Sequence, residues 1–112
     1  MNLVRKEKEF KIGEEEYIMF FDMTSIVVYK ELTKRFFTQG VNKLFEQDDE
    51  EIMYFMASTL RKKDNPKKPL GKKIFEWDVL QLLLLHKWDV IELVAQSLPT
   101  DEETKKKQMM KI

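Results

Sequence analysis

The chain has 112 residues and a mass of 13.5 kDa, and its 20 Lys and Arg balance 20 Asp and Glu, so the formal net charge is zero. This length fits one domain, and the absence of cysteine excludes disulfides and thiolate metal sites. The sequence contains no apolar stretch as long as a membrane span and has a charged N-terminus where a signal peptide is apolar, so we expect a soluble intracellular protein.

Residues 6–21 are expected to form a β-hairpin. In the first run Phe10 and Ile12 are two residues apart, so they point to the same face of a strand. The second run, EYIMFF, has apolar residues at successive positions, so both of its faces are apolar. The Gly13-Glu14 pair between the runs suits a type II′ turn, in which glycine takes a positive φ without a Cβ clash. Because an isolated hairpin is marginally stable, this one must pack against helices or against another chain.

A first helix is predicted from about Met23 to Phe37, with Asp22 as its N-cap. Gly40 is the expected stop, since glycine is the residue that most often ends a helix at the C′ position. Residues 41–45 are expected to add one short helical turn.

The next helix is predicted to start at Asp48 or Asp49. Asp48 and Glu51 form a D-x-x-E cap of the capping-box type, and the acids favour the positive end of the helix dipole. The three bases at 61–63 are expected at the C-terminal end of this helix. Residues 64–73, rich in lysine and proline, are then expected to form a loop.

The motif Trp77-Asp78-Val79 recurs eleven residues later as Trp88-Asp89-Val90. The repeat is compatible with two helices, at 79–86 and 90–98, each with its own cap. It is equally compatible with one continuous helix, in which both Trp side chains share a face because eleven residues span about three turns. The sequence leaves both alternatives open.

Together these elements indicate an α+β fold, mostly α, in which an N-terminal β-hairpin is followed by a bundle of four to five helices. Residues 1–98 are expected to form a single small helical domain with this hairpin. Pro99 is expected to end the last helix, and residues 99–112 to form a polar, disordered tail.

The sequence offers little for catalysis or metal binding. His86 is the one histidine and there is no cysteine, which argues against acid–base or nucleophilic catalysis and against a zinc site. The three glycines are scattered singly, so there is no phosphate-binding loop, and the acids at 48–51 lack the alternating ligands of a calcium loop. We therefore expect no enzyme activity, no cofactor and no metal.

The chain carries many large apolar side chains for so small a core, including eight Phe and seven Met. Flexible, Met-rich surfaces can adapt to varied partners, so we expect part of this set on a protein-binding face. The residues assigned to that face are Phe36, Phe37, Met53, Trp77 and Trp88.

The charges are separated along the chain, with five acids and no base at 46–51 and seven bases and one acid at 61–73. Such blocks favour head-to-tail contacts between copies, although plain solvated surface is the alternative. The residues assigned to a self-association contact are Asp48, Asp49, Glu50, Lys62, Lys63, Lys67 and Lys68. Binding of the basic block to nucleic acid is disfavoured by the zero net charge and by the lack of interleaved aromatic residues.

The order of these segments resembles the tail assembly chaperones of long-tailed phages and of phage-like elements in Gram-positive bacteria. The resemblance covers residues 8–99 and rests on FDM at Phe21–Met23, ASTLR at Ala57–Arg61 and PLGK at Pro69–Lys72. It implies a non-enzymatic protein of the host cytoplasm that binds the tape-measure protein, keeps its apolar helical segments soluble and helps to recruit the tail-tube protein.

A protein of this kind is expected to form homo-oligomers and to bind no membrane. The alternative function is a small nucleic-acid-associated regulatory protein that uses the Lys-rich loop 61–73 to contact phosphates.

Overall fold

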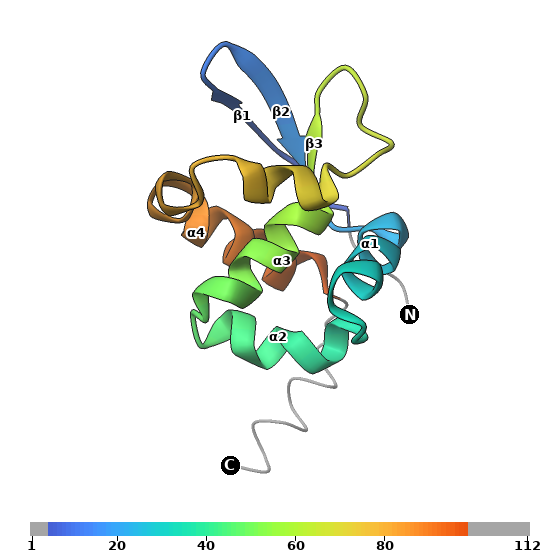
Figure 1. Cartoon of the computed structure of the whole chain (residues 1–112). Helices are drawn as coiled ribbons and strands as arrows, with labels where there is room; N and C mark the ends of the chain where they lie inside the picture. The colour runs from blue at the N-terminus through green and yellow to red at the C-terminus, as the bar shows by residue number, and fades with distance from the viewer. Residues whose placement is uncertain (1–4, 99–112) are drawn as a thin grey trace.

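The computed structural model describes residues 5–98 (Figure 1). In chain order its elements are β1 (Lys8–Ile12), β2 (Glu15–Met19), α1 (Met23–Thr33), α2 (Phe37–Phe45), α3 (Asp49–Thr59), β3 (Leu60–Lys62), the 3-10 helix η1 (Gly71–Glu76) and α4 (Val79–Ser97). The strands form one antiparallel sheet in the order β1-β2-β3. The predicted α+β fold, mostly α with an N-terminal hairpin, is confirmed. The predicted tail at 99–112, with Pro99, lies outside the described residues.

The hairpin has the predicted turn. Ile12 pairs with Glu15, which leaves Gly13 and Glu14 as a two-residue loop. Of these two, only Gly13 takes a positive φ, at 64°, which is the pattern of a type II′ turn. The second strand is also buried on both faces as predicted, since the adjacent side chains of Tyr17 and Ile18 are both buried.

Strand β3 is the first departure from the sequence prediction, which carries α3 forward to the bases at 61–63. The helix ends at Thr59, and Leu60–Lys62 pairs antiparallel with Tyr17–Met19 of β2. The free edge of β2 offers backbone partners that a longer helix would leave unused, so strand pairing is preferred over further helical turns. As a result Arg61 is not an exposed charge at a helix end but a fully buried residue, 0% exposed.

Helix α1 begins as predicted and ends earlier. Asp22 caps it by accepting a hydrogen bond from the Ser25 backbone N–H at 3.0 Å, and Ser25 returns a capping-box contact. The helix ends at Thr33, because Lys34 adopts the left-handed conformation with φ 62°. The predicted stop at Gly40 is wrong, since this glycine lies inside α2.

Gly40 is needed for close packing, which explains its place inside a helix. A Cβ at this position would overlap the Tyr29 hydroxyl and the Glu51 carboxylate. The missing side chain therefore lets α2 approach the polar contact that joins α1 to α3.

Helix α4 is one continuous helix of 19 residues, which decides between the two alternatives for this segment. Asp78 is its N-cap and accepts a hydrogen bond from the Gln81 backbone N–H at 3.1 Å. The two tryptophans do not share a face. Trp77 precedes the cap and packs edge-on against Tyr17, with ring centroids 5.5 Å apart, whereas Trp88 is 60% exposed.

One hydrophobic cluster joins the sheet to the helices. Helix α3 lies at its centre, between α1, α2 and α4 (Figure 1). Fully buried side chains from five elements meet there: Met19 of β2, Leu44 of α2, Phe55 of α3, Ile74 of η1 and Leu93 of α4. Helix α4 buries one side in this core and leaves the other side uncovered.

Candidate protein-binding surfaces

The uncovered side of α4 is strongly apolar. We define the α4 face as Leu80, Leu84, Leu85 and Trp88, all of them exposed, Leu84 to 78%. Leu80, Leu84 and Trp88 recur at i, i+4 and i+8, so they follow one another along the helix. Because Leu82 of the same segment is buried in the core, this part of α4 is apolar all round, a pattern typical of buried helices.

Exposed acidic side chains lie just before α4 in the chain and at the start of α3, which contacts α4. Lys87 beside Trp88 pairs with Asp49, with Nζ 3.7 Å from Oδ1, and this contact brings the start of α3 next to α4. The Glu50 carboxylate accepts a hydrogen bond from Tyr54, whose ring packs edge-on against Phe75 of η1. We define the acidic rim by its exposed members: Asp48, Asp49, Glu50, Glu76 and Asp78.

A second exposed apolar surface lies on α1. We define the α1 groove as the hollow of about 560 Å³ lined by Met23, Ile26, Val27, Lys30, Glu31, Lys34 and Phe36. Ile26 is buried, whereas Met23, Val27 and Phe36 are exposed large apolar residues. The hollow can therefore accept apolar side chains from a partner.

Lysines gather along both sides of α1. A neighbouring hollow of about 480 Å³ lies between α1 and the loop before η1, and it includes apolar Val28, Leu32 and Leu70. Glu31 and Lys34 line this hollow as well as the α1 groove. We define the basic rim as the lysines of the two hollows: Lys30, Lys34, Lys67, Lys68 and Lys72. Against these five lysines stands one acid, Glu31.

The residues predicted for a protein-binding face are divided by the structure. Phe36 and Trp88 are exposed, and Trp77 is half-buried. Phe37 and Met53 are 1% and 2% exposed, so their assignment to a binding face is wrong. Phe37 packs edge-on against Phe21, with ring centroids 5.4 Å apart, and Met53 lies in the core cluster.

Val27 and the leucines of the α4 face were not among the residues predicted for a binding surface. A signal for the leucines exists in the run VLQLLLL at 79–85, because one helix face cannot bury apolar residues at so many adjacent positions.

The residues predicted for charged self-association are all exposed: Asp48, Asp49, Glu50, Lys62, Lys63, Lys67 and Lys68. The acids lie at the turn between α2 and α3, and the lysines lie across the molecule, around the loop after β3 (Figure 1). Lys63 is paired with the hairpin, its Nζ 3.3 Å from Glu9 and 4.0 Å from Glu16. A contact between the two charged groups therefore needs a second copy, and it stays a prediction.

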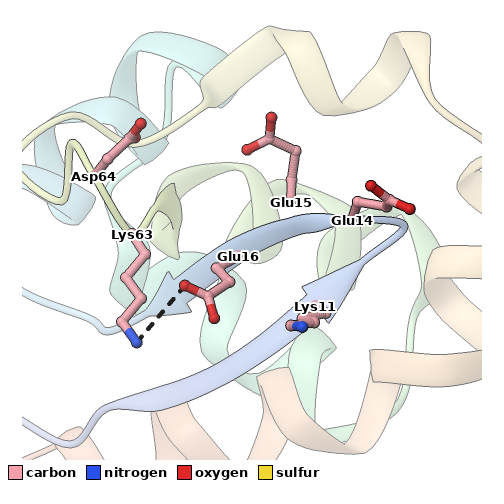
Figure 2. Close-up of a pocket in the computed structure, with 6 residues that line it drawn as sticks. All are labelled: Lys11, Glu14, Glu15, Glu16, Lys63 and Asp64. Carbon is pink, nitrogen blue, oxygen red and sulfur yellow. Dashed lines mark ion pairs between the residues drawn. The ribbon is translucent and has the colours of Figure 1, made fainter.

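A recess of about 420 Å³ lies between the hairpin turn and the loop after β3. Figure 2 shows that Glu14, Glu15 and Glu16 of this recess point away from one another, with Lys11 and Lys63 among them. Across residues 5–98 no three Asp, Glu or His side chains are grouped so that they could hold a metal ion. The recess is a surface of mixed charge.

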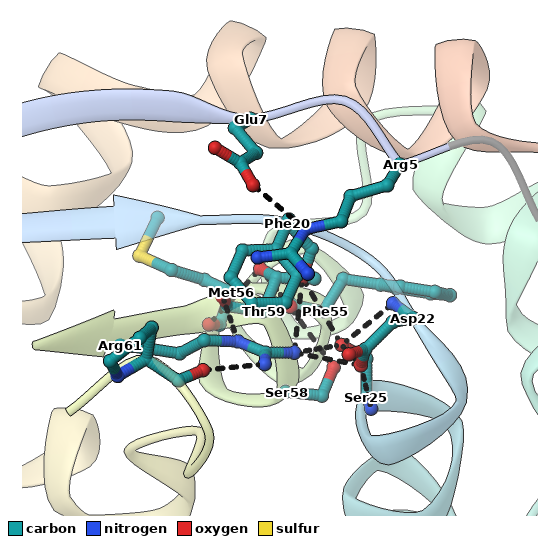
Figure 3. A network of polar contacts seen from close by, with 11 residues as sticks. Arg5, Glu7, Phe20, Asp22, Ser25, Phe55, Met56, Ser58, Thr59 and Arg61 are labelled. Carbon is teal, nitrogen blue, oxygen red and sulfur yellow. Dashed lines mark hydrogen bonds and ion pairs between the residues drawn. The ribbon is translucent and has the colours of Figure 1, made fainter. Parts of the chain in front are cut away.

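A buried polar network fixes the start of α1 and the base of the basic loop (Figure 3). The guanidinium of Arg61 donates to the Asp22 carboxylate at 2.9 Å, to the Ser25 hydroxyl at 2.8 Å and to the Pro66 carbonyl at 2.8 Å. It also lies 3.6 Å from the centroid of the Phe20 ring. These contacts link β3, the start of α1 and the loop after β3, and so they hold α1 against the loop with which it lines the neighbouring hollow.

The charges of this network are matched. Burial lowers the pKa of Arg61, against the opposing effect of the Asp22 carboxylate. Burial alone would raise the pKa of Asp22, but hydrogen bonds from Arg61 and Ser25 outweigh it and hold that pKa below its usual value. Within the described chain every buried side-chain nitrogen and oxygen has a hydrogen-bond partner, so the network serves as a structural joint.

A second polar contact joins α1 to α3. The Glu51 carboxylate is buried, accepts a hydrogen bond from the Tyr29 hydroxyl and pairs with Arg35 at 2.9 Å. Burial and the neighbouring carboxylate raise the pKa of Tyr29. The predicted cap at Asp48 is present, since its carboxylate accepts from the Glu51 N–H at 2.9 Å, but the Glu51 side chain turns inward and completes no capping box.

His86 serves to pack the first strand against α4. Its ring stacks on Phe10, with centroids 4.4 Å apart, and its Nδ1 lies 3.3 Å from Oδ2 of Asp89. Asp89 also accepts a hydrogen bond from Lys8 of β1 at 3.3 Å. The histidine is thus part of a contact between β1 and α4.

None of the helices within residues 5–98 is both long and apolar enough to cross a bilayer. Comparison of the chain with protein-family models, with curated proteins and with solved structures finds no match. The two apolar surfaces and their charged rims are therefore the features from which a function can be inferred.

Proposed function

We propose that this protein is a tail assembly chaperone of a long-tailed phage or phage-like element. In this role it binds apolar helical segments of the tape-measure protein in the host cytoplasm, keeps them soluble and assists tail-tube assembly without enzymatic chemistry. The observation that carries the proposal is the α4 face, with Leu84 78% and Trp88 60% exposed to solvent. The resemblance of the sequence to this family supplies the identity of the client.

The α4 face suits an amphipathic helix as its client. Helix α4 is about 28 Å long, and its exposed Leu and Trp side chains can meet client residues spaced at i, i+3 or i+4, and i+7. Burial of one such side chain contributes roughly 1.5 to 3 kcal/mol. One copy therefore binds a client helix weakly, and several copies along a long client gain affinity from their high effective concentration.

Burial of apolar surface also explains how one chaperone can serve many client segments. This interaction is non-directional and scales with area, so it does not require a particular client sequence. The acidic rim adds a preference for client helices with basic residues beside their apolar stripe.

Nucleic-acid binding by the loop at 61–73 is the less supported function. Arg61 is fully buried and Lys63 is paired with glutamates of the hairpin, so two of the seven bases are not free to contact phosphates. Phosphate contacts through the remaining lysines would weaken steeply with salt, whereas apolar client binding would not.

The proposal is tested by co-expression of the full chain with the tape-measure protein encoded in the same phage or prophage. We expect the wild-type chain to keep the client in the soluble fraction and the Leu84→Lys variant to lose most of this effect, because it places a charge in the α4 face. Asn42→Lys, at an exposed position of α2, is the matched control and should act as the wild type.

Two results would overturn the proposal. One is a client that aggregates equally with and without the wild-type chain. The other is retention of the client by Leu84→Lys at the wild-type level. Binding to single-stranded DNA that falls steeply between 50 and 200 mM salt, roughly as a multi-phosphate contact predicts, would favour the alternative function instead.

A further inference from the structure

We infer that residues 1–4 dock in the α1 groove of their own chain and cover it. This segment, MNLV, comes directly before the described residues and carries no charged side chain. The inference assigns an occupant to the α1 groove. It does not rest on the proposed function, which uses the α4 face.

The pairing of β1 with β2 directs the chain before Arg5 toward the start of α1. Lys8 lies opposite Met19, and this antiparallel register, continued by three residues, sets Arg5 opposite Asp22, the N-cap of α1. Four extended residues span at most about 14 Å, which is roughly the rise of nine residues in an α-helix. Residues 1–4 are therefore long enough to lie along the first two turns of α1.

Arg5 is held on one side of the Phe20 ring. Its guanidinium lies 3.9 Å from the ring centroid, and the guanidinium of Arg61 lies 3.6 Å from the same centroid. Two such groups cannot share one face of a ring at these distances, so they lie on opposite faces (Figure 3). Because Arg61 also binds the Pro66 carbonyl, the ring separates Arg5 from the loop after β3.

The α1 groove lies on the flank of α1 that this loop leaves open. On the other flank the loop and α1 line the neighbouring hollow, to which Thr24 and Val28 contribute. Met23, Ile26 and Val27 line the groove, and none of its described lining residues belongs to the loop. The chain before Arg5 can therefore enter the groove without crossing the loop.

Alternation along an extended chain sets which side chains face the groove. Successive side chains point to opposite sides, so Met1 and Leu3 share the side of Arg5, whose guanidinium packs on Phe20. Asn2 lies on the opposite side, toward water. The two apolar residues that share a side are thus the ones that enter the groove, and the polar residue is left outside.

The contact buries apolar surface of both partners. In the groove, Met23 is 61% and Val27 54% exposed, and Leu3 supplies an apolar side chain to cover them. Removal of this surface from water favours docking, whereas fixing four backbone residues costs conformational entropy of similar size. The segment is therefore held weakly, and a partner with more apolar surface can displace it. Residues 1–4 serve as a removable cover.

The lysines beside the groove favour this segment over the other apolar stretch outside the described residues. That stretch, QMMKI at 108–112, follows three lysines at 105–107. The basic rim, which includes Lys30 and Lys34 of the groove, repels a lysine-rich segment. MNLV brings no side-chain charge to the rim, so its approach is less opposed.

The first test places one cysteine in the segment and one on α1, since the chain has no other cysteine. With oxidised glutathione, Leu3→Cys/Val27→Cys should form an intramolecular disulfide roughly tenfold faster than Leu3→Cys/Thr24→Cys, because docked side chains have the higher effective concentration. Thr24 is the matched control, since it is exposed and nearer in sequence but lies on the other flank. Non-reducing electrophoresis and peptide mass mapping measure the products, and any purification tag follows residue 112.

The second test measures how well the groove is covered. Dilute hydrogen peroxide converts accessible methionine to the sulfoxide, and peptide mass mapping gives the rate at Met23. We expect Leu3→Asp to raise this rate several-fold, because a carboxylate does not enter an apolar groove. Asn2→Asp adds the same charge on the side that faces water, so it should oxidise at the wild-type rate. Circular dichroism confirms that both variants are folded.

Four results would overturn the inference. Equal rates for the two cysteine pairs would place the segment outside the groove, and a disulfide between two chains at low concentration would assign the groove to a second copy. An unchanged rate at Met23 in Leu3→Asp would mean that the segment does not cover it. Protection that is lost in Met109→Asp instead would assign the groove to residues 108–112.

Failure of the proposed function is distinguishable from failure of this inference. Leu84→Lys changes the α4 face and leaves residues 1–4 and the α1 groove as they are, so it should not alter the oxidation rate of Met23. Loss of client binding with Met23 still protected would therefore concern the α4 face alone.

Discussion

The guanidinium of Arg61 and the carboxylate of Asp22 lie 2.9 Å apart, although 39 residues separate them in the chain. The same carboxylate caps α1 through the Ser25 N–H, so Asp22 joins the first turn of the helix to β3. Since Arg61 is fully buried, neither partner can be lost without leaving an uncompensated polar group.

Replacement of Arg61 should destabilise the fold. We expect Arg61→Met to lower the free energy of unfolding by about 1 to 3 kcal/mol, because it removes the donor to the Asp22 carboxylate, whose side chain is 34% exposed, and to the Pro66 carbonyl. Arg61→Lys should recover only part of the loss, since an ammonium lacks the planar fork that reaches several acceptors. Urea denaturation measures the free energy of unfolding of both variants.

The control is Lys62→Met, at the exposed neighbouring position, which should stay within about 0.5 kcal/mol of the wild type. An Arg61→Met variant as stable as the wild type would contradict this role for the network.

Asp22 should contribute to acid unfolding. Its folded-state pKa is lowered, so its contribution to stability is complete above the unfolded-state pKa of about 3.9 and is lost as the pH falls through the lower folded-state value. At pH 6 we expect Asp22→Asn to be less stable than the wild type. Between pH 4 and pH 2.5, roughly the range below the unfolded-state pKa of Asp, the variant should lose less stability than the wild type does. Urea midpoints across this range test the sign. Equal or steeper acid sensitivity of the variant would show that Asp22 is not held ionised by Arg61.

Gly40 should resist replacement even by alanine. In an exposed helix, Gly→Ala stabilises by about 1 kcal/mol, but here the added Cβ overlaps the Tyr29 hydroxyl and the Glu51 carboxylate. We expect Gly40→Ala to destabilise the protein by about 1 to 3 kcal/mol, as overpacked core sites do. Asn42→Ala in the same helix is the control, because its side chain is exposed and its substitution should leave the urea midpoint nearly unchanged. A more stable Gly40→Ala variant would mean that α2 can move away at little cost.

Local contacts explain which parts of the fold could be predicted from the sequence. The caps at Asp22, Asp48 and Asp78 each bind a backbone N–H three residues ahead, so the sequence alone contains both partners. The turn at Gly13 is likewise determined by two adjacent residues. Strand β3 could not be predicted in this way, because its three residues become a strand only through the free edge of β2.

Gly40 and Glu51 were misread for a related reason. Each fits a frequent local motif, a helix stop and a capping box, yet each is used in a contact between helices instead. Local motifs give the correct residue types here, but tertiary packing decides their role.

The candidate surfaces show the same division. Phe36 and Phe37 are neighbours in the sequence, but one is exposed and the other is buried against Phe21. Which of two adjacent apolar residues faces the core depends on where the other helices lie. The α4 face could not be predicted from the run of leucines, because a segment that is apolar all round does not indicate which of its sides packs against the core.

The contact between β1 and α4 also affects the order of folding. Lys8 meets Asp89 across 81 residues of chain, and the stack of Phe10 on His86 reinforces this distant pairing. Such non-local contacts are slow to form, because the entropy cost of closing a long loop comes before the contacts can stabilise the fold. A nascent chain can pair β1 with β2 early, but the contact of β1 with α4 forms only after α4 has left the ribosome. Until then Phe10 of β1 lacks the His86 ring that stacks on it in the finished fold.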